Sequence, residues 1–271
     1  MYNRRDVNYA VITGAASGLG LAIAKHLADE CNLVLMDRNG AALTAASSDF
    51  CGVEMVAGDV ADPESWERAR ACLHGSPPKW LVQCAGIAVT GAIADAPIEH
   101  WRKAIEINLL GLVLGCRTFV PGMAEEGGGH IVHIASRAAI SGVPGMGPYA
   151  ASKAAVVAMS ETLYNEIGDR VTVTVACPSY FQSNLAEGMV ACHDIERRIL
   201  RHRIGASPRT ADDMARAVIE AARRGDLYFF PPREDRRFWL RKRLMPTRAL
   251  RSIRDRFRSA VRAMNEGRER R

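Results

Sequence analysis

Aromatic residues, paired cysteines and long apolar runs are all scarce in this 271-residue chain. Only 6% of the residues are aromatic, and the seven cysteines are odd in number with no Cys-x-x-Cys pair. A disulfide framework and a structural zinc site are therefore not expected, and we predict no metal site. We find no run of about 18 uncharged apolar residues, the length that spans a bilayer. Met1–Tyr9 also lack the apolar core of a signal peptide, so we expect a cytoplasmic protein.

The excess of positive charge is confined to one end of the chain. The formal net charge is +6, but residues 233–271 carry +10 and residues 1–232 carry −4. The basic character is therefore not a property of the main fold. We divide the chain into a main domain, residues 1–232, which we expect to be catalytic, and a basic extension, residues 233–271.

Short apolar runs alternate with longer stretches of helical periodicity. The expected strands are Tyr9–Thr13, Leu33–Asp37, Val53–Ala57, Trp80–Gln83, His130–Ala135, Val171–Ala176 and Leu227–Phe230. The expected helices include Gly18–Asp29, Pro63–Leu73, Ile98–Gly115, Tyr149–Gly168 and Ala211–Arg223. This alternation predicts an α/β fold, a doubly wound seven-stranded parallel sheet with helices on both faces. Ligands of such folds bind beyond the carboxyl ends of the strands.

A glycine-rich turn follows the first expected strand directly. It runs Thr13-Gly14-Ala15-Ala16-Ser17-Gly18-Leu19-Gly20 and leads into the first helix. A tight turn of small residues lets the backbone approach a pyrophosphate, and the helix N-terminus supplies free N–H groups. This placement favours a Rossmann-type dinucleotide site that includes Gly14, Ser17, Gly18, Leu19 and Gly20.

An acidic residue ends the second expected strand, and another follows the third expected strand after one glycine. A carboxylate at Asp37 can accept hydrogen bonds from the ribose hydroxyls and would repel a 2′-phosphate, which favours NAD over NADP. Arg38 could instead attract that phosphate, so both cofactors stay open. Asp59, followed by Val60, could meet the adenine amino group, although an ordinary turn aspartate fits the sequence nearly as well.

Three side chains near the middle of the chain suit proton transfer. Tyr149 and Lys153 are four residues apart on an expected helix and so share one face. A cation beside a phenol favours the phenolate and is expected to lower the pKa of Tyr149. Ser136 ends the fifth strand, where a ligand would lie, and its hydroxyl could bond a reacting oxygen.

These motifs together resemble the short-chain dehydrogenase/reductase family over about residues 8–230. The matching positions are Thr13–Gly20, Asp59, Ala85-Gly86, Asn108, Ser136 and Tyr149-x-x-x-Lys153. The resemblance implies that Tyr149 is the general acid/base, that Ser136 positions the reacting oxygen, and that Lys153 bonds the nicotinamide ribose. It also implies that Asn108 holds a water in a proton relay; without it, Asn108 is an ordinary buried polar residue.

Two departures from the family pattern stand beside the match. Gln83-Cys84 replaces the usual Asn-Asn, which puts a structural hydrogen bond across the sheet in doubt. Pro178 is followed by Ser179 instead of glycine, and Ser183 takes the place of a threonine. By resemblance, Pro178 and Ser183 border the nicotinamide, and Ser183 keeps a hydroxyl that can reach its carboxamide.

Residues Ser183–Arg209 occupy the place of the family's variable substrate segment. Leu185, Met189 and Val190 could line an apolar pocket, and His193 is a weak candidate for a substrate contact. Tyr180-Phe181 lie alongside and favour an apolar substrate.

The basic extension alternates apolar and charged residues with helical spacing. Its apolar positions are Leu250, Ile253, Phe257, Val261 and Met264, and its arginines include Arg248, Arg251, Arg254, Arg258 and Arg262. We expect a basic amphipathic helix. Peripheral contact with an anionic membrane and packing on this or a second subunit both remain open, whereas nucleic-acid binding is not expected.

The leading interpretation is an NAD(P)(H)-dependent oxidoreductase that interconverts a secondary alcohol and a ketone. A dinucleotide-binding regulator or scaffold is the alternative, and the intact Ser136, Tyr149 and Lys153 set argues against it. An epimerase or dehydratase would need a larger C-terminal domain. By analogy with the family, the helices around Asn108 and Tyr149 pair subunits, so we expect a homodimer or homotetramer.

Overall fold

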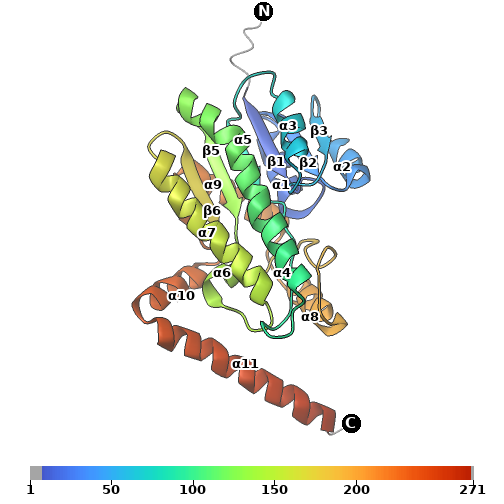
Figure 1. The fold of residues 1–271 in the computed structure, drawn as a ribbon, viewed down its shortest axis with the longest axis vertical. Coiled ribbons are helices and arrows are strands. Elements are labelled where there is room, and N and C mark those ends of the chain that lie inside the picture. Colours follow the sequence, from blue (N-terminus) through green and yellow to red (C-terminus); the bar gives the residue numbers. More distant parts are fainter. Residues whose placement is uncertain (1–7, 270–271) are drawn as a thin grey trace, which may run out of the picture.

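The computed structural model describes residues 8–269, and the side chains of residues 8–259. A seven-stranded parallel sheet forms its centre, in the order β3-β2-β1-β4-β5-β6-β7 (Figure 1). The strands are β1 (Tyr9–Thr13), β2 (Asn32–Asp37), β3 (Glu54–Ala57), β4 (Trp80–Gln83), β5 (His130–Ile134), β6 (Thr172–Ala176) and β7 (Tyr228–Phe229). This confirms the predicted fold class. Residues 1–7, which include most of the segment examined for a signal peptide, lie outside the described residues.

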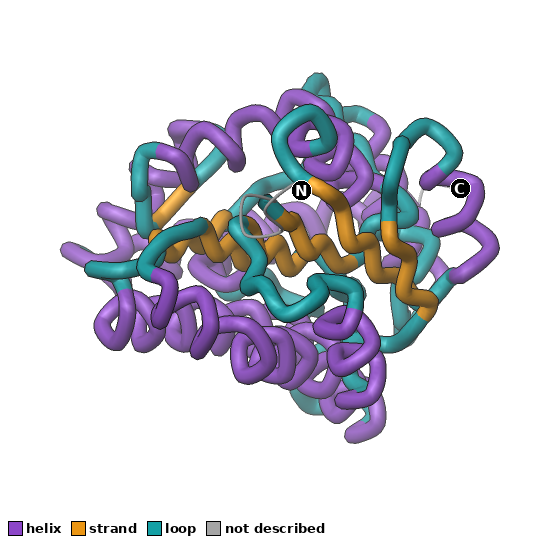
Figure 2. The backbone as a smooth tube through the Cα atoms, turned by 90° about the horizontal axis from the view of Figure 1, so that it is seen from above, coloured by secondary structure: helices purple, strands orange, loops and turns teal. Residues whose placement is uncertain are grey.

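Helices cover both faces of the sheet, which Figure 2 shows between two layers of helix. The main helices are α1 (Gly18–Leu27), α2 (Gly40–Ser47), α3 (Pro63–Ala71), α5 (Gly111–Glu126), α7 (Gly147–Ile167) and α9 (Ala211–Arg223). One apolar core joins α1, α2 and α9 to the sheet, and a second joins α3, α5 and α7. The inner strands β1, β4, β5 and β6 are mostly apolar because both sides of the sheet are buried there, whereas β3 at the edge is mostly exposed.

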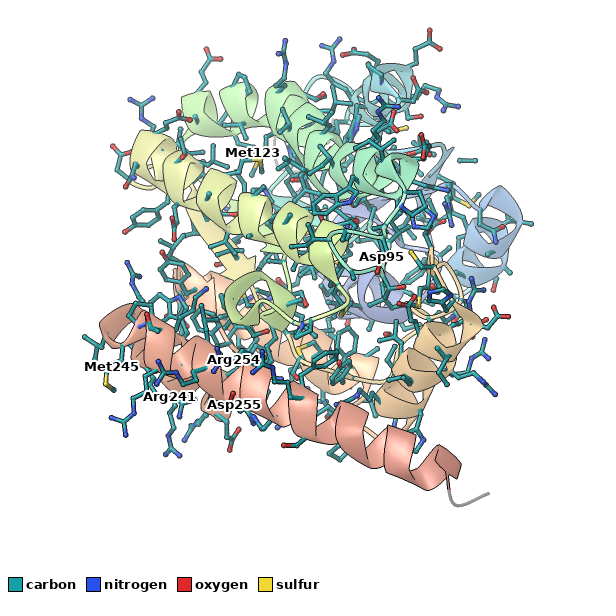
Figure 3. All side chains as sticks on the ribbon, turned by 60° about the horizontal axis from the view of Figure 1, so that its bottom comes forward. Asp95, Met123, Arg241, Met245, Arg254 and Asp255 are labelled. Carbon is teal, nitrogen blue, oxygen red and sulfur yellow. The ribbon has the colours of Figure 1, made fainter. Side chains whose placement is uncertain are left out.

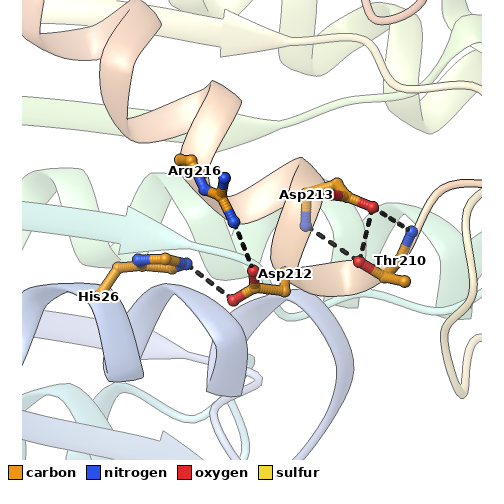
Figure 4. Close-up of polar contacts among 5 residues, drawn as sticks. All are labelled: His26, Thr210, Asp212, Asp213 and Arg216. Carbon is orange, nitrogen blue, oxygen red and sulfur yellow. Dashed lines mark hydrogen bonds and ion pairs between the residues drawn. The ribbon is translucent and has the colours of Figure 1, made fainter.

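The pairing of α1 with α9 is reinforced by polar contacts at the start of α9 (Figure 4). His26 of α1 lies 2.8 Å from Asp212, which also accepts a hydrogen bond from Arg216 at 3.0 Å. Thr210 and Asp213 form a reciprocal capping box that satisfies the N–H groups of both residues. These contacts fix the residue at which α9 begins.

One helical run is longer and more apolar than expected. α4 (Ile98–Ile105), the π-helical turn η2 (Glu106–Leu110) and α5 continue as one helix, Ile98–Glu126. By length and composition it could cross a membrane when isolated charges are allowed, so it comes closer to a spanning segment than the sequence analysis expected. The expectation counted uncharged residues only, and this run contains isolated charges such as Arg117. Phe119 and Met123 of α5 are buried against α3 and the sheet, as in a core helix of a globular protein.

The basic extension forms two helices, α10 (Arg233–Leu244) and α11 (Pro246–Glu269). Phe238 and Ala249 are buried with residues of β6 and α7, so α10 and the first turn of α11 pack on the main body. The remainder of α11 extends along the lower edge of the molecule in Figure 1. A helical extension is therefore confirmed, whereas the domain boundary at residue 232 stays a prediction. The side chains of Val261, Arg262 and Met264 lie outside the described residues.

Candidate active site

A cavity of about 280 Å³ opens at the carboxyl ends of the strands. It lies where the strand order reverses between β1 and β4, the usual ligand position in doubly wound sheets. Its lining includes the predicted residues Gly14, Ser17, Gly18, Leu19, Gly20, Asp37, Arg38, Asp59, Val60, Ala85, Gly86, Ser136, Tyr149, Lys153, Pro178 and Ser183. Residues far apart in the sequence are thus brought to one cavity, with Asn108 behind it.

The glycine turn packs so tightly that side chains are excluded at Gly14 and Gly20. A Cβ on Gly20 would lie 2.3 Å from the carbonyl oxygen of Gly14, and one on Gly14 would lie 2.9 Å from the backbone nitrogen of Ala85. Gly14 has a φ of +65°, which disfavours any residue with a side chain. Thr13 Oγ1 accepts the Ala85 N–H at 3.1 Å and ties the turn to the loop after β4. The backbone at the N-terminus of α1 can therefore approach a ligand closely at these glycines, which fits a pyrophosphate.

Asp37 and Asp59 are held by the backbone at the border of the cavity. The two carboxylate oxygens of Asp37 accept the N–H groups of Ala16 at 3.1 Å and of Asn39 at 2.9 Å. Asp59 Oδ1 accepts the Ala61 N–H at 2.9 Å, so it shapes a turn and also borders the cavity. Both acidic side chains are thereby oriented before any ligand binds.

Tyr149 lies almost fully buried on α7, and Ser136 caps the N-terminus of α6 (Arg137–Ser141). Ser136 Oγ accepts the Ala138 N–H at 3.1 Å. Burial raises the pKa of Tyr149 because it penalises the phenolate, and a hydrogen bond with Ser136 only partly opposes this. The expectation that Lys153 lowers the pKa of Tyr149 is therefore not met by the protein's own groups.

Lys153 is a buried ammonium group one helical turn after Tyr149. Its Nζ donates to the carbonyl oxygen of Ile134 at 2.7 Å, at the end of β5. Burial lowers the pKa of Lys153 to about 8, against a smaller opposing effect of the Cys84 and Cys177 thiols. An ammonium group has three N–H donors, so two remain for other partners at the cavity.

Asn108 is fully buried in the π-helical turn and does not line the cavity. Its Oδ1 accepts the Ile87 N–H at 2.8 Å, and its Nδ2 donates to Ile87 O and Ser152 Oγ, each at 3.0 Å. A Cβ on Gly86 would lie 3.0 Å from this Oδ1 and 3.2 Å from Lys153 Nζ, so glycine permits both to approach. Asn108 thus connects the loop after β4 to α7, and its part in a proton relay stays a prediction.

The far end of the cavity is apolar and is closed by α8 (Asp194–Gly205). Leu185 lines it as predicted, together with Val143, Met146, Leu200 and Ile204. Met189 and Val190 do not line it: Met189 packs beneath α8, and Val190 pairs with Val89. The sequence interpretation missed Leu200 and Ile204, although their spacing of four residues is a helical signal.

His193 caps the start of α8 at an exposed position and does not border the cavity, so its candidacy as a substrate contact is not supported. The side chain of Glu196, in the first turn of α8, fixes the start of this helix. Its Oε2 accepts hydrogen bonds from Thr90 Oγ1 at 2.5 Å and from the Cys192 N–H at 3.0 Å. The substrate segment is therefore attached to the loop after β4.

The two departures from the family pattern have structural answers. Gln83 is buried and its Nε2 donates to Leu112 O at 3.1 Å, so a hydrogen bond still joins β4 to α5. Cys84 lines the cavity, and burial raises the pKa of its thiol to about 12. Ser179 also lines the cavity, and its N–H donates to Pro231 O at 3.1 Å.

Comparisons with known proteins agree with this geometry. A family model described as short chain dehydrogenase matches residues 8–192. The chain is 32% identical to 1-deoxy-11-beta-hydroxypentalenate dehydrogenase from Streptomyces exfoliatus, over 82% of each protein. It resembles a short chain dehydrogenase/reductase from Burkholderia phymatum in complex with NAD, at a TM-score of 0.77, 28% identity, and 84% and 90% coverage of the two chains. It also resembles actinorhodin polyketide ketoreductase with NADPH, at a TM-score of 0.74, 27% identity, and 85% and 97% coverage.

Proposed function

The chain belongs to the short-chain dehydrogenase family, whose members are NAD(P)-dependent oxidoreductases, and from this premise we propose that it interconverts an apolar secondary alcohol and a ketone. One observation carries the proposal. Ser136, Tyr149 and Lys153 line the same cavity as the glycine turn, and the far end of that cavity is apolar. Proton-transfer groups and a dinucleotide site thus share one enclosed space.

The bound nicotinamide would supply the hydride acceptor or donor. Ser136 orients the reacting oxygen with its hydroxyl, and Tyr149 takes or gives the proton on that oxygen. Lys153 holds its ammonium group at the cavity through Ile134 O and can bond a ribose hydroxyl with its remaining N–H donors. Val143, Met146 and Leu200 exclude water from the apolar end.

We further propose that NAD(H) is favoured over NADP(H). Both carboxylate oxygens of Asp37 are already oriented at the end of β2, and a 2′-phosphate beside them would be repelled. Arg38 is exposed and is the group that could accept NADP. An Asp37→Ser variant should lose preference for NAD and gain activity with NADP, as measured by kcat/KM with each cofactor; an unchanged ratio would contradict the assignment.

The activity itself is tested by following reduction of NAD and NADP spectrophotometrically with secondary alcohols of graded chain length. Tyr149→Phe should abolish turnover, because it removes only the hydroxyl that exchanges the proton. Tyr164→Phe is the matched control, since Tyr164 lies on the same helix and is 42% exposed. Turnover that survives in Tyr149→Phe would exclude this mechanism. A folded protein that binds NADH but oxidises no alcohol and reduces no matching ketone would favour the regulator or scaffold interpretation.

For the basic extension we propose peripheral contact with an anionic membrane by a cytoplasmic protein. Leu244, Met245, Leu250 and Phe257 are exposed apolar residues among the arginines of α10, α11 and the junction between them. Figure 3 shows Arg241, Met245, Arg254 and Asp255 along these two helices. Exposed apolar side chains flanked by basic ones suit an interface of anionic lipids.

The membrane proposal is tested by co-sedimentation with vesicles that contain phosphatidylserine. A Leu250→Ser/Phe257→Ser variant should sediment less than the native protein, whereas Ile93→Ser, at an exposed site away from the extension, should not differ. Equal sedimentation of all three would leave packing on a second subunit as the interpretation. Light scattering of the same proteins measures whether the chain forms the expected dimer or tetramer.

A further inference from the structure

An ion pair connects the segment that carries Ser136 with the basic extension. Arg137 Nε of α6 lies 2.7 Å from Asp235 Oδ1 of α10. The Asp235 side chain is only 7% exposed, and that of Arg137 is 32% exposed. Arg137 also borders the active-site cavity. A residue outside the predicted catalytic domain is therefore in contact with the wall of the site.

Arg137 is held at a mechanistically sensitive point. It is the first residue of α6, directly after Ser136, and its N–H donates to Pro178 O at 2.9 Å. Ser136 itself accepts the Ala138 N–H through its side chain. The start of α6 is thus fixed by three contacts: one within α6, one with the loop after β6, and one with α10.

The helix that supplies Asp235 is well anchored. Phe238, one turn later, is buried, and the Arg137 guanidinium lies 6.0 Å from its ring centroid. Trp239 packs against Tyr228 and Phe230, with ring centroids 4.9 and 5.0 Å apart. Asp235 is therefore a fixed partner for Arg137.

We propose that Asp235 is a positioning residue of the active site. Through Arg137 it holds the start of α6, and with it the Ser136 hydroxyl, and it keeps the guanidinium at the cavity wall. The proposal rests on the function proposed above. An ion pair with one buried partner contributes little to stability, because desolvation of the buried charge offsets the attraction. Its location beside the proposed catalytic serine agrees better with a role in geometry.

The test compares Asp235→Asn, which removes the charge and keeps the size, with Glu234→Gln at the exposed neighbouring position. Asp235→Glu is the conservative variant that should restore part of the function. Hydrogen–deuterium exchange of residues 136–142 reports on the start of α6 without any need for turnover. Kinetics and NADH affinity are measured on the same full-length proteins.

Asp235→Asn should exchange faster at residues 136–142 and lose about 10- to 100-fold in kcat, because small displacements of a positioning group cost about this much. The KM for the alcohol and the Kd for NADH should stay within about twofold, since the cofactor site is not displaced. Arg137→Gln should have the same effects. The Asp235→Asn/Arg137→Gln double variant should lose no more kcat than either single variant, because both changes break the same contact.

Unchanged exchange and kcat in Asp235→Asn would overturn the proposal, even where Tyr149→Phe abolishes turnover and the oxidoreductase function stands. If no substrate is turned over by the native protein, exchange and melting temperature decide together: faster exchange at residues 136–142 with an unchanged melting temperature supports the positioning role, and unchanged exchange or a lowered melting temperature overturns it. Equal losses of kcat and NADH affinity, together with a lower melting temperature in all Asp235 variants, would show a merely structural residue.

Discussion

At the scale of single residues, the candidate site contains a buried ammonium group, that of Lys153. Lys153 is 4% exposed, and burial lowers its pKa to about 8. The folded state therefore resists protonation of Lys153, and at neutral pH that resistance reduces the free energy of unfolding. A buried charge of this kind lowers stability, which is consistent with the catalytic role proposed for Lys153.

Replacing Lys153 should therefore separate stability from activity. Lys153→Met should raise the free energy of unfolding by about 1–2 kcal/mol, after allowing for the hydrogen bond lost at Ile134 O. The same change should abolish alcohol oxidation. Chemical denaturation at pH 7, with turnover measured on the same samples, checks both; a destabilised variant would mean that the hydrogen bond outweighs the buried charge.

The glycine turn makes a second prediction at this scale. Gly20→Ala should weaken NADH binding by about tenfold or more, because its Cβ would overlap the carbonyl of Gly14 and force the turn apart. Gly205→Ala is the control, as a Cβ there meets no atom within 4 Å. Fluorescence titration with NADH measures both, and equal affinities would show that the turn can relax.

At the scale of elements, helices placed late in the chain complete the site. α8 closes the apolar end of the cavity, and α10 contacts the start of α6. α10 carries mostly charged residues, yet Phe238 belongs to a core cluster with Ala135 and Cys177, both adjacent to the site. A helix that is polar in composition can therefore be firmly attached through one face.

Shortening the buried Phe238 side chain of α10 should lower the stability of the protein. Phe238→Ala should lower the free energy of unfolding by about 3 kcal/mol, the usual cost of a large buried side chain. Leu244→Ala on the same helix should have almost no effect, because Leu244 is 80% exposed. Denaturant unfolding of both variants is the measurement, and equal small effects would mean that α10 is only loosely docked.

At the scale of the whole molecule, a buried polar chain joins the central sheet to two helices on one of its faces. His133 of β5 lies with Nδ1 2.8 Å from Ser160 Oγ of α7 and Nε2 3.4 Å from Cys116 Sγ of α5. Burial, and then the positive charge of Lys153, lower the pKa of His133 to about 3. In the unfolded chain the pKa returns to near 6.5.

Stability should consequently fall in mild acid. Between pH 6.5 and 3 the unfolded state binds a proton at His133 that the folded state does not, so this contribution is complete above pH 6.5 and is lost as the pH falls. Between pH 6.5 and 5 the loss is about 2 kcal/mol. The free energy of unfolding of His133→Gln should fall less steeply with falling pH than that of the native protein. His202→Gln, changed at an exposed position, should show the same pH dependence as the native protein. Parallel curves for all three would contradict the shifted pKa.

Much of this protein is determined by local sequence. Strand and helix periodicity, the turn at Thr13–Gly20 and the spacing of Tyr149 and Lys153 act over a few residues, so they predict the fold and most of the cavity lining. Which faces of α8 and α10 are buried is harder to predict from the sequence, because the many charged residues of these helices obscure the spacing of the apolar ones.

Other properties depend on which distant residues meet. The raised pKa of Tyr149, the position of Met189 beneath α8 and the pairing of Arg137 with Asp235 all arise from contacts between separate segments. Burial and charge pairing have no fixed spacing along the chain, and their energies depend on the local surroundings. The sequence by itself therefore determined the chemistry that is present, and only the tertiary structure decided how each group is held.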